Sequence, residues 1–445
     1  MERIIRRIVE NVLWGIKAGF KSNLNEEINM KVIKSVLLAL ALVFGGSVFA
    51  ADLTLLVPSG PDGDGLRLLG EDYQKLTSVT VESVQVPYVN AREKVFTACS
   101  TRSGSFDIYL LDDPWFQGLA DAKCLERLTP YFSALGTDGP DNDFVGLSLA
   151  LCRDPYAKGP FYCLPFVGNA MMFFYNPTML KEAGYTGPMD TWEDVKKAAK
   201  MVADKGRRRK FGFMMAANQQ QAFAGWLAAF WSYDGRVLGA DGKTPSLNSE
   251  AGRKALDLWL ELAKSAPPGV EGMAFEELMT NLTQRVSSTA IFWPIFVSIL
   301  EDPDQSKVVG EMKYTALPFG SVPGKGMIGH WVAGISTESK KKQAAFDFIN
   351  WATAPEQIKT SALRGNSPVR LSVFEDPELI SQDKFRFFPV LLNSIRNSVP
   401  RPRHKNWEQM SIIIGEEINA VMSGTKTRDE GLAAADARIA PLLVK

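Results

Sequence analysis

Histidine is almost missing from this chain, whose 445 residues include only His330 and His404. This scarcity excludes a zinc site of the H-E-x-x-H type, in which two histidines stand on one face of a helix. The sequence also lacks the G-x-S-x-G turn of serine hydrolases, the phosphate-binding P-loop and the G-x-G-x-x-G dinucleotide turn. It contains no C-x-x-C pair that could ligate a metal. We therefore expect no enzyme activity, no catalytic residue, no cofactor and no metal ion.

An excess of either charge is missing too, because 50 Lys and Arg residues balance 50 Asp and Glu residues. Binding to nucleic acid or to an anionic membrane surface relies on clustered basic residues, so we expect neither partner. Hydrophobic residues make up 46% and charged residues 22% of the chain, as in ordinary soluble domains. At roughly 100–200 residues per domain, the length predicts two or three domains.

The segment MKVIKSVLLALALVFGGSVFA, from Met30 to Ala50, has the organisation of a signal peptide. Lysines precede an apolar run, and the small residues Val48 and Ala50 stand where signal peptidase requires them. The uncharged run from Ser35 to Ala51 is short for a membrane span, which needs about 20 residues. We predict that residues 30–50 are cleaved off before Ala51 and that the protein is periplasmic. The alternative is an uncleaved anchor.

Residues 1–29 precede this segment. Arg3, Arg6 and Arg7, with apolar residues at helical spacing, fit an amphipathic helix on a membrane surface. The alternative, which we favour, is a mis-assigned start, with Met30 as the real initiator.

Export to an oxidising compartment makes disulfide bonds the expected use of the four cysteines. Cys152 and Cys163 flank RDPYAKGPFY, in which Asp-Pro and Lys-Gly-Pro indicate turns. We predict a local disulfide there, and Cys99 with Cys124 as the second pair.

Short apolar strands alternate with helical segments after Ala51. The predicted strands are LTLLV (53–57), VTVESVQVP (79–87) and DIYLL (107–111). This alternation predicts an α/β fold with a parallel sheet. Such sheets bind ligands in loops beyond the carboxyl ends of their strands, which here are PSGPDGDG (58–65) and DDPW (112–115). The acids and the tryptophan of these loops therefore stand where a ligand would bind.

Four longer segments resemble, in the same order, those of a known family. They are FDIYLLDDPWFQGLADAKCLERLTPYF, LPFVGNAMMFFYNPTMLKEAGY with TWEDVKKAAK, WVAGISTESKKKQAAFDFINWATAPEQ, and GTKTRDEGLAAADARI. Two of them contain a helix-capping box, Thr191 with Asp194 and Thr427 with Glu430. The chain is similar to the extracellular (periplasmic) solute-binding proteins of ABC importers, in the carbohydrate-binding group that includes maltodextrin-binding proteins.

The resemblance implies the two-lobed α/β fold of type II periplasmic binding proteins, each lobe a mostly parallel sheet flanked by helices, with the ligand cleft between the lobes. On this mapping the N-terminal lobe holds residues 51–165 and 292–338, and the C-terminal lobe holds 168–290 and 340–445. The chain would cross between lobes near Pro165–Gly168, Trp293 and Thr337. Such a protein is a monomer that closes like a hinge over its solute and delivers it to an ABC permease.

A carbohydrate or polyol offers hydroxyl groups and an apolar face of C–H groups. Its site needs aromatic rings for that face, and carboxylates, amides or guanidinium groups for the hydroxyls, because unpaired polar groups are costly once buried. Asp113 and Trp115 supply both, although Asp112 or Asp113 could instead cap the helix that follows. The predicted ligand contacts are Asp113, Trp115, Asn169, Trp226, Trp293, Trp331, Arg364, Asn366, Ser59 and Asp62.

Two other functions fit many of the same residues. An exported carbohydrate-active enzyme needs two carboxylates facing each other across the substrate, and the adjacent pairs Asp112/Asp113, Glu276/Glu277 and Glu416/Glu417 are the candidates. A binding subunit of a sugar sensor or chemoreceptor would differ only in its partner. The ligand stays open among monosaccharides, oligosaccharides, polyols and glycerol phosphodiesters. A cleft-facing Arg364 or Arg370 would favour an acidic or phosphorylated solute.

Overall fold

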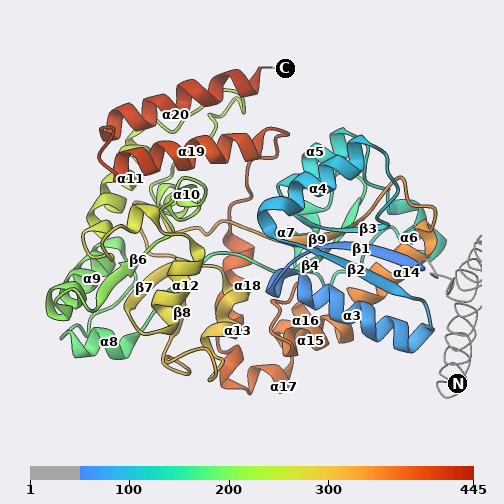
Figure 1. Ribbon diagram of the computed structural model, residues 1–445, viewed down its shortest axis with the longest axis horizontal. Helices are drawn as coiled ribbons and strands as arrows, with labels where there is room; N and C mark the ends of the chain where they lie inside the picture. Colours follow the sequence, from blue (N-terminus) through green and yellow to red (C-terminus); the bar gives the residue numbers. More distant parts are fainter. Residues whose placement is uncertain (1–50, 445) are drawn as a thin grey trace, which may run out of the picture. The chain divides into compact units, whose positions relative to one another are not determined.

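The computed structural model describes residues 51–444 (Figure 1). The predicted signal peptide, residues 30–50, and the upstream residues 1–29 lie outside this range. Within it, no helix is both long and apolar enough to span a membrane.

The first of two sheets has five strands in the order β2-β1-β3-β9-β4. They are β1 (Leu53–Pro58), β2 (Val81–Val86), β3 (Ile108–Asp112), β4 (Cys163–Val167) and β9 (Trp331–Ile335). The predicted strands β1, β2 and β3 are confirmed and pair in parallel. Strand β9 runs antiparallel between β3 and β4, and its register sets Trp331 opposite Asp112. The amino end of β9 therefore lies at the edge where β3 ends.

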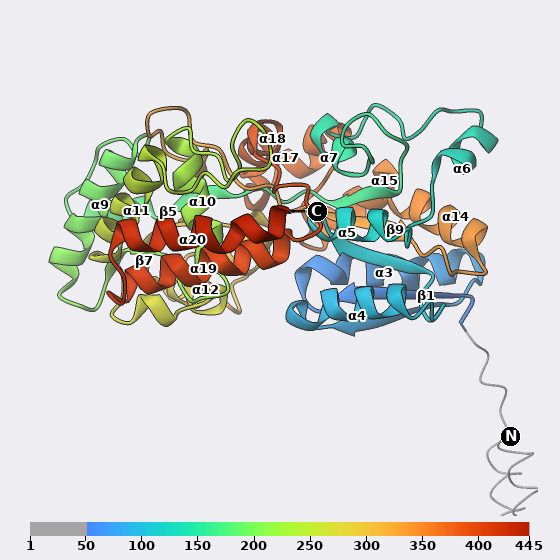
Figure 2. The ribbon, with the colours of Figure 1, turned by 90° about the horizontal axis from the view of Figure 1, so that it is seen from above.

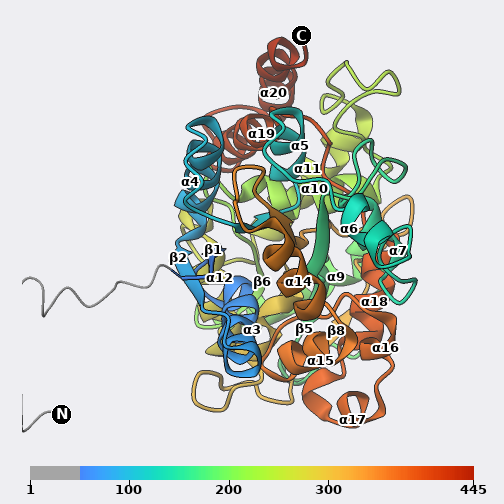
Figure 3. The same cartoon turned by 90° about the vertical axis from the view of Figure 1, so that its right-hand side faces the viewer.

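Helices cover this sheet, as the alternating sequence predicts. They are α3 (Pro61–Thr77), α4 (Tyr88–Ser100), α5 (Trp115–Asp121), α6 (Thr129–Ala134), α7 (Gly146–Leu151), α14 (Lys342–Ala352) and α15 (Pro355–Leu363). Helix α3 packs on β1 and β2, α4 on β1, and α14 on both β9 and α3 (Figure 2). Figure 3 shows α15 beside the short helix α16 (Leu371–Phe374), which in turn contacts α17 (Pro377–Ile380).

The second sheet has four strands in the order β6-β7-β5-β8. They are β5 (Met172–Tyr175), β6 (Phe211–Met214), β7 (Ser287–Phe292) and β8 (Lys313–Thr315). Strand β5 is antiparallel to β7 and β8, whereas β6 and β7 are parallel.

The remaining helices are α8 (Pro177–Glu182), α9 (Trp192–Gly206), α10 (Ala222–Ser232), α11 (Glu250–Ala263), η1 (Val270–Gly272), α12 (Phe275–Thr283), η2 (Pro294–Phe296), α13 (Val297–Leu300), η3 (Asp383–Phe385), α18 (Phe388–Asn397), α19 (Trp407–Met422) and α20 (Arg428–Leu443).

Helices α9 and α20 begin where the capping patterns predict. In both, the N-cap threonine side chain accepts a hydrogen bond from the backbone of the acid three residues later, and that acid accepts one in return. Each box satisfies backbone donors that the first helical turn would otherwise leave without a partner.

The sheet pairing departs from the predicted lobe ranges at two places. Strand β8, inside the range 292–338 assigned to the first lobe, pairs with β5 in the four-stranded sheet, although η2, directly after Trp293, packs against α3. The crossing near Trp293 therefore stays a prediction, and the chain also passes to the five-stranded sheet between β8 and β9. It also stays on that sheet beyond Thr337, because α14 packs against β9 and α3. The other lobe boundaries stay predictions.

One disulfide bond joins Cys99 and Cys124, whose Cα atoms are 5.6 Å apart. The predicted bond between Cys152 and Cys163 is wrong for this structure, in which both are buried free thiols. Burial, reinforced by a hydrogen bond with Cys152, raises the pKa of the Cys163 thiol well above its usual value. Because oxidation proceeds through the thiolate, this environment makes the Cys163 thiol less reactive towards oxidants.

Replacing both Cys99 and Cys124 by serine is expected to lower the free energy of unfolding by about 3 kcal/mol. The bond closes a loop over a sequence separation of 25, and a loop of that length carries a stabilisation of this size through the unfolded chain. Urea unfolding of the oxidised protein and of the double variant measures the difference. Dithiothreitol should destabilise the wild type to the level of the variant and leave the variant unchanged. Equal stability of the oxidised wild type and the variant would contradict the assignment.

Candidate functional site

Two carboxylates and one guanidinium group meet, almost fully buried, where β3 ends. Asp113 is 1% exposed and Arg401, from the segment between α18 and α19, is 5% exposed. Arg401 Nη1 donates to Asp112 Oδ2 at 3.1 Å, and Nη2 donates to both Asp112 Oδ1 and Asp113 Oδ1. The loop acids of the DDPW segment are therefore bound by a cation that stands almost 290 positions later in the chain. Arg401 was not among the predicted ligand contacts, because its local segment RPRHK shows no ligand-site pattern.

Three aromatic rings cover this ion pair. Trp115 opens α5, Trp331 opens β9 and Tyr88 opens α4. The centroids of the two indole rings are 5.6 Å apart at 86°, and the Tyr88 ring lies 5.7 Å from Trp115 and 5.9 Å from Trp331. The Tyr88 hydroxyl donates to Asp112 Oδ2 at 2.9 Å. Trp115 and Trp331, predicted from separate segments, are thus brought together by the antiparallel pairing of β3 and β9. We call Tyr88, Trp115 and Trp331 the aromatic group.

Asp62, in the first turn of α3, joins the same cluster. Trp331 donates a hydrogen bond to its carboxylate, while Oδ1 is buried and has no partner among the described residues. Burial, and after it the negative charge of Asp112, raise the pKa of Asp62 from 3.8 to about 7. We call Asp62, Asp112 and Asp113 the acidic cluster.

Asp113 has a similar environment. Its Oδ1 pairs with Arg401, but Oδ2 is buried with no donor in the part of the chain that the structure describes. Burial raises the pKa of Asp113 to about 6, although the charge of Arg401 opposes the rise. Two carboxylate oxygens of different residues are thus left without a protein partner, and each needs a donor from elsewhere.

Other charged side chains surround the cluster. Glu408 lies in the first turn of α19, and burial followed by the charge of Asp112 raises the pKa of its carboxyl. Arg92 of α4 and Arg401 counteract that rise. The Arg403 guanidinium lies over the Phe116 ring, and its Nη1 donates to the Leu151 carbonyl at 3.0 Å.

His330 connects the acidic cluster to Asn169. Its carbonyl accepts a hydrogen bond from the Asp113 amide at 2.9 Å. Its ring nitrogen Nδ1 lies 3.1 Å from the Asn169 carbonyl oxygen and 3.2 Å from the Asn169 amide nitrogen, so the tautomer decides whether it donates to the first or accepts from the second. The other ring nitrogen lies 2.7 Å from Ser148 Oγ. Burial lowers the pKa of His330 to about 4, so the ring is neutral near pH 7. Asn169 is buried, and its Oδ1 is a third acceptor without a partner among residues 51–444.

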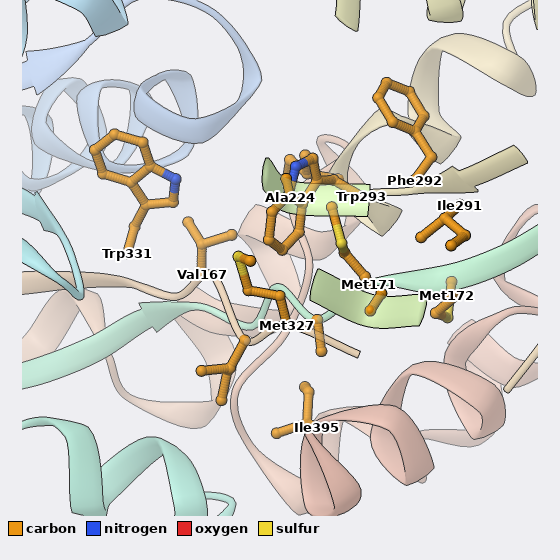
Figure 4. Packing of buried hydrophobic residues seen from close by; sticks show 14 of the residues in the cluster. Val167, Met171, Met172, Ala224, Ile291, Phe292, Trp293, Met327, Trp331 and Ile395 are labelled. Carbon is orange, nitrogen blue, oxygen red and sulfur yellow. The ribbon is translucent and has the colours of Figure 1, made fainter. Parts of the chain in front are cut away.

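The other predicted tryptophans lie in two different environments. The Trp293 ring packs against Gly329, where a Cβ atom would lie 2.6 Å away, and Figure 4 shows the ring beside Met171 and Ala224. It therefore borders the segment that leads into Trp331. Trp226 is fully buried in α10 and stacks on Phe230 at a centroid distance of 5.0 Å. None of the contacts described for it reaches the acidic cluster.

The loop RGNSPVR contributes one buried amide. Asn366 is buried, and its unpartnered Nδ2 faces Gly65 of α3, close to the turn that holds Asp62. The same loop contacts the segment between β4 and β5, because the Gly168 amide donates to the Ser367 carbonyl at 2.9 Å. Asn366 thus borders the site region, on the α3 side.

Two arginines considered at the sequence level lie elsewhere, and Ser59 stays a prediction. Ser59 is exposed directly after β1, three residues before Asp62. Arg364 donates to Asp72 at 2.5 Å on the surface. Arg370 is buried but donates to Asp141 at 2.8 Å, to Asp143 at 3.2 Å and to the Thr353 carbonyl. No arginine of the RGNSPVR loop faces the acidic cluster.

The paired glutamates have structural partners instead. Glu277 accepts a hydrogen bond from the Ala274 amide at the start of α12. Arg438 donates to Glu416 at 2.5 Å and to Glu417 at 2.8 Å. Of the three acidic pairs, Asp112 and Asp113 alone belong to the cluster. The described residues contain no group of His, Cys, Asp and Glu arranged to hold a metal ion.

The sequence of this chain is similar to those of several known binding proteins. A probable amino-acid ABC transporter periplasmic-binding protein of Sinorhizobium fredii is 28% identical over 422 residues, 88% of this chain and 93% of that protein. The mannitol-binding protein of Pseudomonas aeruginosa is 27% identical, over 86% of this chain and 91% of its own length.

A solved structure has the same fold. The ABC transporter solute-binding protein of Agrobacterium radiobacter in complex with ribitol superposes with a TM-score of 0.79, over 88% of this chain and 98% of that protein, at 24% identity. This likeness shows the type II periplasmic-binding-protein fold, with two sheets flanked by helices. The model of the bacterial extracellular solute-binding proteins matches residues 58–359, more than half of the sequence, and the chain belongs to this family.

Proposed function

We propose that this protein captures a carbohydrate or polyol outside the cell and hands it, unaltered, to an ABC permease. One observation carries the proposal: buried acceptors without protein donors lie beside aromatic rings. Asp62 Oδ1, Asp113 Oδ2 and Asn169 Oδ1 each lack a partner among the described residues. A buried acceptor without a donor costs about 1–3 kcal/mol, so these oxygens favour a ligand that brings hydroxyl donors.

The aromatic group supplies the second part of such a site. Indole and phenol rings present flat apolar faces, and the C–H face of a sugar or polyol packs against surfaces of this kind. Asp113 and Trp115 occupy the end of β3 and the start of α5, beyond the carboxyl edge of the sheet. The Pseudomonas aeruginosa relative named for mannitol and the neighbouring structure with ribitol support a polyol.

The proposed ligand contacts are Asp62, Asp113, Trp115, Asn169, Trp293, Trp331 and Asn366, together with Tyr88 and Arg401, which the structure adds.

The proposal also covers where the protein works and how it releases its ligand. The mature protein begins near Ala51, works in the periplasm as a monomer, and closes by a hinge motion when its ligand binds. Relatives named as binding proteins, and not as enzymes, support release without chemistry.

Polyols should stabilise the protein against heat. At 100 times its dissociation constant, D-mannitol or ribitol is expected to add about 2.7 kcal/mol to the free energy of unfolding and to raise the melting temperature. Differential scanning calorimetry with polyols, monosaccharides and maltose ranks the ligands. L-leucine serves as a control, because a relative is named for amino acids. A shift with leucine and none with any polyol or sugar would contradict the proposal.

Single substitutions in the cluster should weaken that binding. Trp331→Phe removes the hydrogen bond to Asp62, and Asp113→Asn replaces a buried carboxylate by an amide. Each is expected to raise the dissociation constant about tenfold to a hundredfold, the range for one lost buried interaction. Isothermal titration calorimetry measures the change.

Matched control variants separate a site effect from a loss of folding. Trp351→Phe alters a half-buried tryptophan on α14, and Asp121→Asn alters an exposed acid at the end of α5. Both should bind with wild-type affinity. Equal weakening by site and control variants would show that the acidic cluster is not the binding site.

A further inference from the structure

The buried cluster carries more negative than positive charge. The acidic cluster supplies three carboxyl groups, and Arg401 is the cation that pairs with two of them. Asp112 has both oxygens engaged, by Arg401 and by Tyr88. Asp62 receives a hydrogen bond from the neutral indole of Trp331. One guanidinium group therefore pairs with two of the three acids. Glu408 adds a fourth acid nearby, and Arg92 and Arg403 are the two further cations whose charges reach the group, so the acids still exceed the cations by one.

The terminal nitrogens of the two arginines nearest Asp113 are already engaged. Those of Arg401 are bound to carboxylates, and those of Arg403 donate to the carbonyls of Leu151 and Arg153. The Nε atoms of Arg92, Arg401 and Arg403 are buried without a partner among the described residues, so each leaves one donor for a ligand oxygen. The charge of Arg401 is already matched by two acids, however. Arg364 is paired with Asp72, outside the cluster.

We propose that this site is a charge filter: it admits uncharged and ammonium-bearing polyols and rejects phosphorylated or acidic ones, with Asp62 and Asp113 as the discriminating residues. This inference rests on the proposed function and narrows its ligand class. A phosphate or carboxylate placed against the unpartnered oxygens of Asp62 and Asp113 would add negative charge to a buried site that already has an excess. Like charges brought together at a desolvated contact cost several kcal/mol.

A hydroxyl group or an ammonium group has the opposite effect. Either donates a hydrogen bond to a carboxylate oxygen, and the bond from an ammonium group is the stronger because both partners are charged. An ammonium group would also neutralise part of the excess negative charge of the buried carboxylates. The aminated form of a polyol should therefore bind at least as tightly as the polyol itself.

Four compounds with one six-carbon skeleton test the filter. They are D-mannitol, 1-amino-1-deoxy-D-mannitol, D-mannonate and D-mannitol 1-phosphate, titrated by calorimetry at pH 7.5 and fixed ionic strength. We expect the two anions to bind at least about a hundredfold more weakly than D-mannitol, and the amine to bind as tightly or more tightly. An anion that binds within tenfold of D-mannitol would overturn the inference.

The variant Asp62→Asn tests whether Asp62 is responsible for the discrimination between D-mannitol and its anionic forms. The variant keeps the size of the side chain but removes its charge, so the gap between D-mannitol and D-mannonate should narrow about tenfold or more. Asp121→Asn, the exposed control, should leave the gap unchanged. A gap of the same size in both variants would overturn the role given to Asp62.

If none of the four compounds binds, the proposed function is contradicted for polyols of this skeleton. A measurement without any ligand then still tests whether the charge of Asp62 is compensated. The pKa of Asp62 is about 7 in the folded chain against 3.8 for a free side chain, so the folded state holds the proton more tightly. Its contribution to stability is then present at low pH and lost as the pH rises towards and through 7. Asp112 and Trp331 face this carboxyl, and no cation pairs with it in the described residues.

The expected outcome is a higher melting temperature for Asp62→Asn than for the wild type at pH 8, with the advantage shrinking at pH 5. An advantage that is equal at both pH values, or absent at pH 8, would show that the Asp62 charge is compensated and would overturn the filter. Asp121→Asn provides the baseline for an acid that is exposed to water.

Discussion

The buried contact between Arg401 and the acids Asp112 and Asp113 holds the candidate site together. Removing charges from water is expensive, and breaking such a group by deleting one partner costs about 3–5 kcal/mol because it leaves buried charge unmatched. Here the contact joins the end of β3 to the segment between α18 and α19. Without the guanidinium group, Asp62, Asp112 and Asp113 could not remain close together in their ionised forms.

Strand direction explains why distant tryptophans meet. The carboxyl ends of the parallel strands β1 and β3 lie at one edge of the sheet, and β9 enters antiparallel beside β3. Its first residue, Trp331, therefore lies where β3 gives way to the loop that holds Asp113. Trp115 opens α5 directly after that loop. A parallel β9 would have placed Trp331 at the opposite edge of the sheet, away from Asp62.

Local patterns were enough to predict the first strands, the capped starts of α9 and α20, and the loops that hold Asp62, Asp113 and Trp115, whereas Trp331 was predicted only from the family resemblance. Each depends on a few neighbouring residues and on one rule about sheet edges. The pairing of Arg401 with Asp112 was out of reach, because no rule of spacing connects residues so far apart. Strand β8 was missed because three residues carry too little periodicity. The Cys99–Cys124 bond was predicted correctly, but the Cys152–Cys163 bond was wrong, because turn signals report a bend without the separation of the sulfur atoms.

Three polar groups of the site come from segments between the strands and helices of the two sheets, whereas Asp62 lies on α3 and Asp113 directly after β3. Asn169 lies between β4 and β5, His330 between β8 and β9, and Arg401 between α18 and α19. His330 is bonded to the backbone of both Asn169 and Asp113, so a shift of one connecting segment changes the surroundings of the others. A ligand that supplies donors to Asp62, Asp113 and Asn169 would bridge an outer helix, a strand end and a connecting segment. Its binding energy would then favour the one arrangement of the connecting segments in which all three acceptors are satisfied, which is how a small solute can select a closed form.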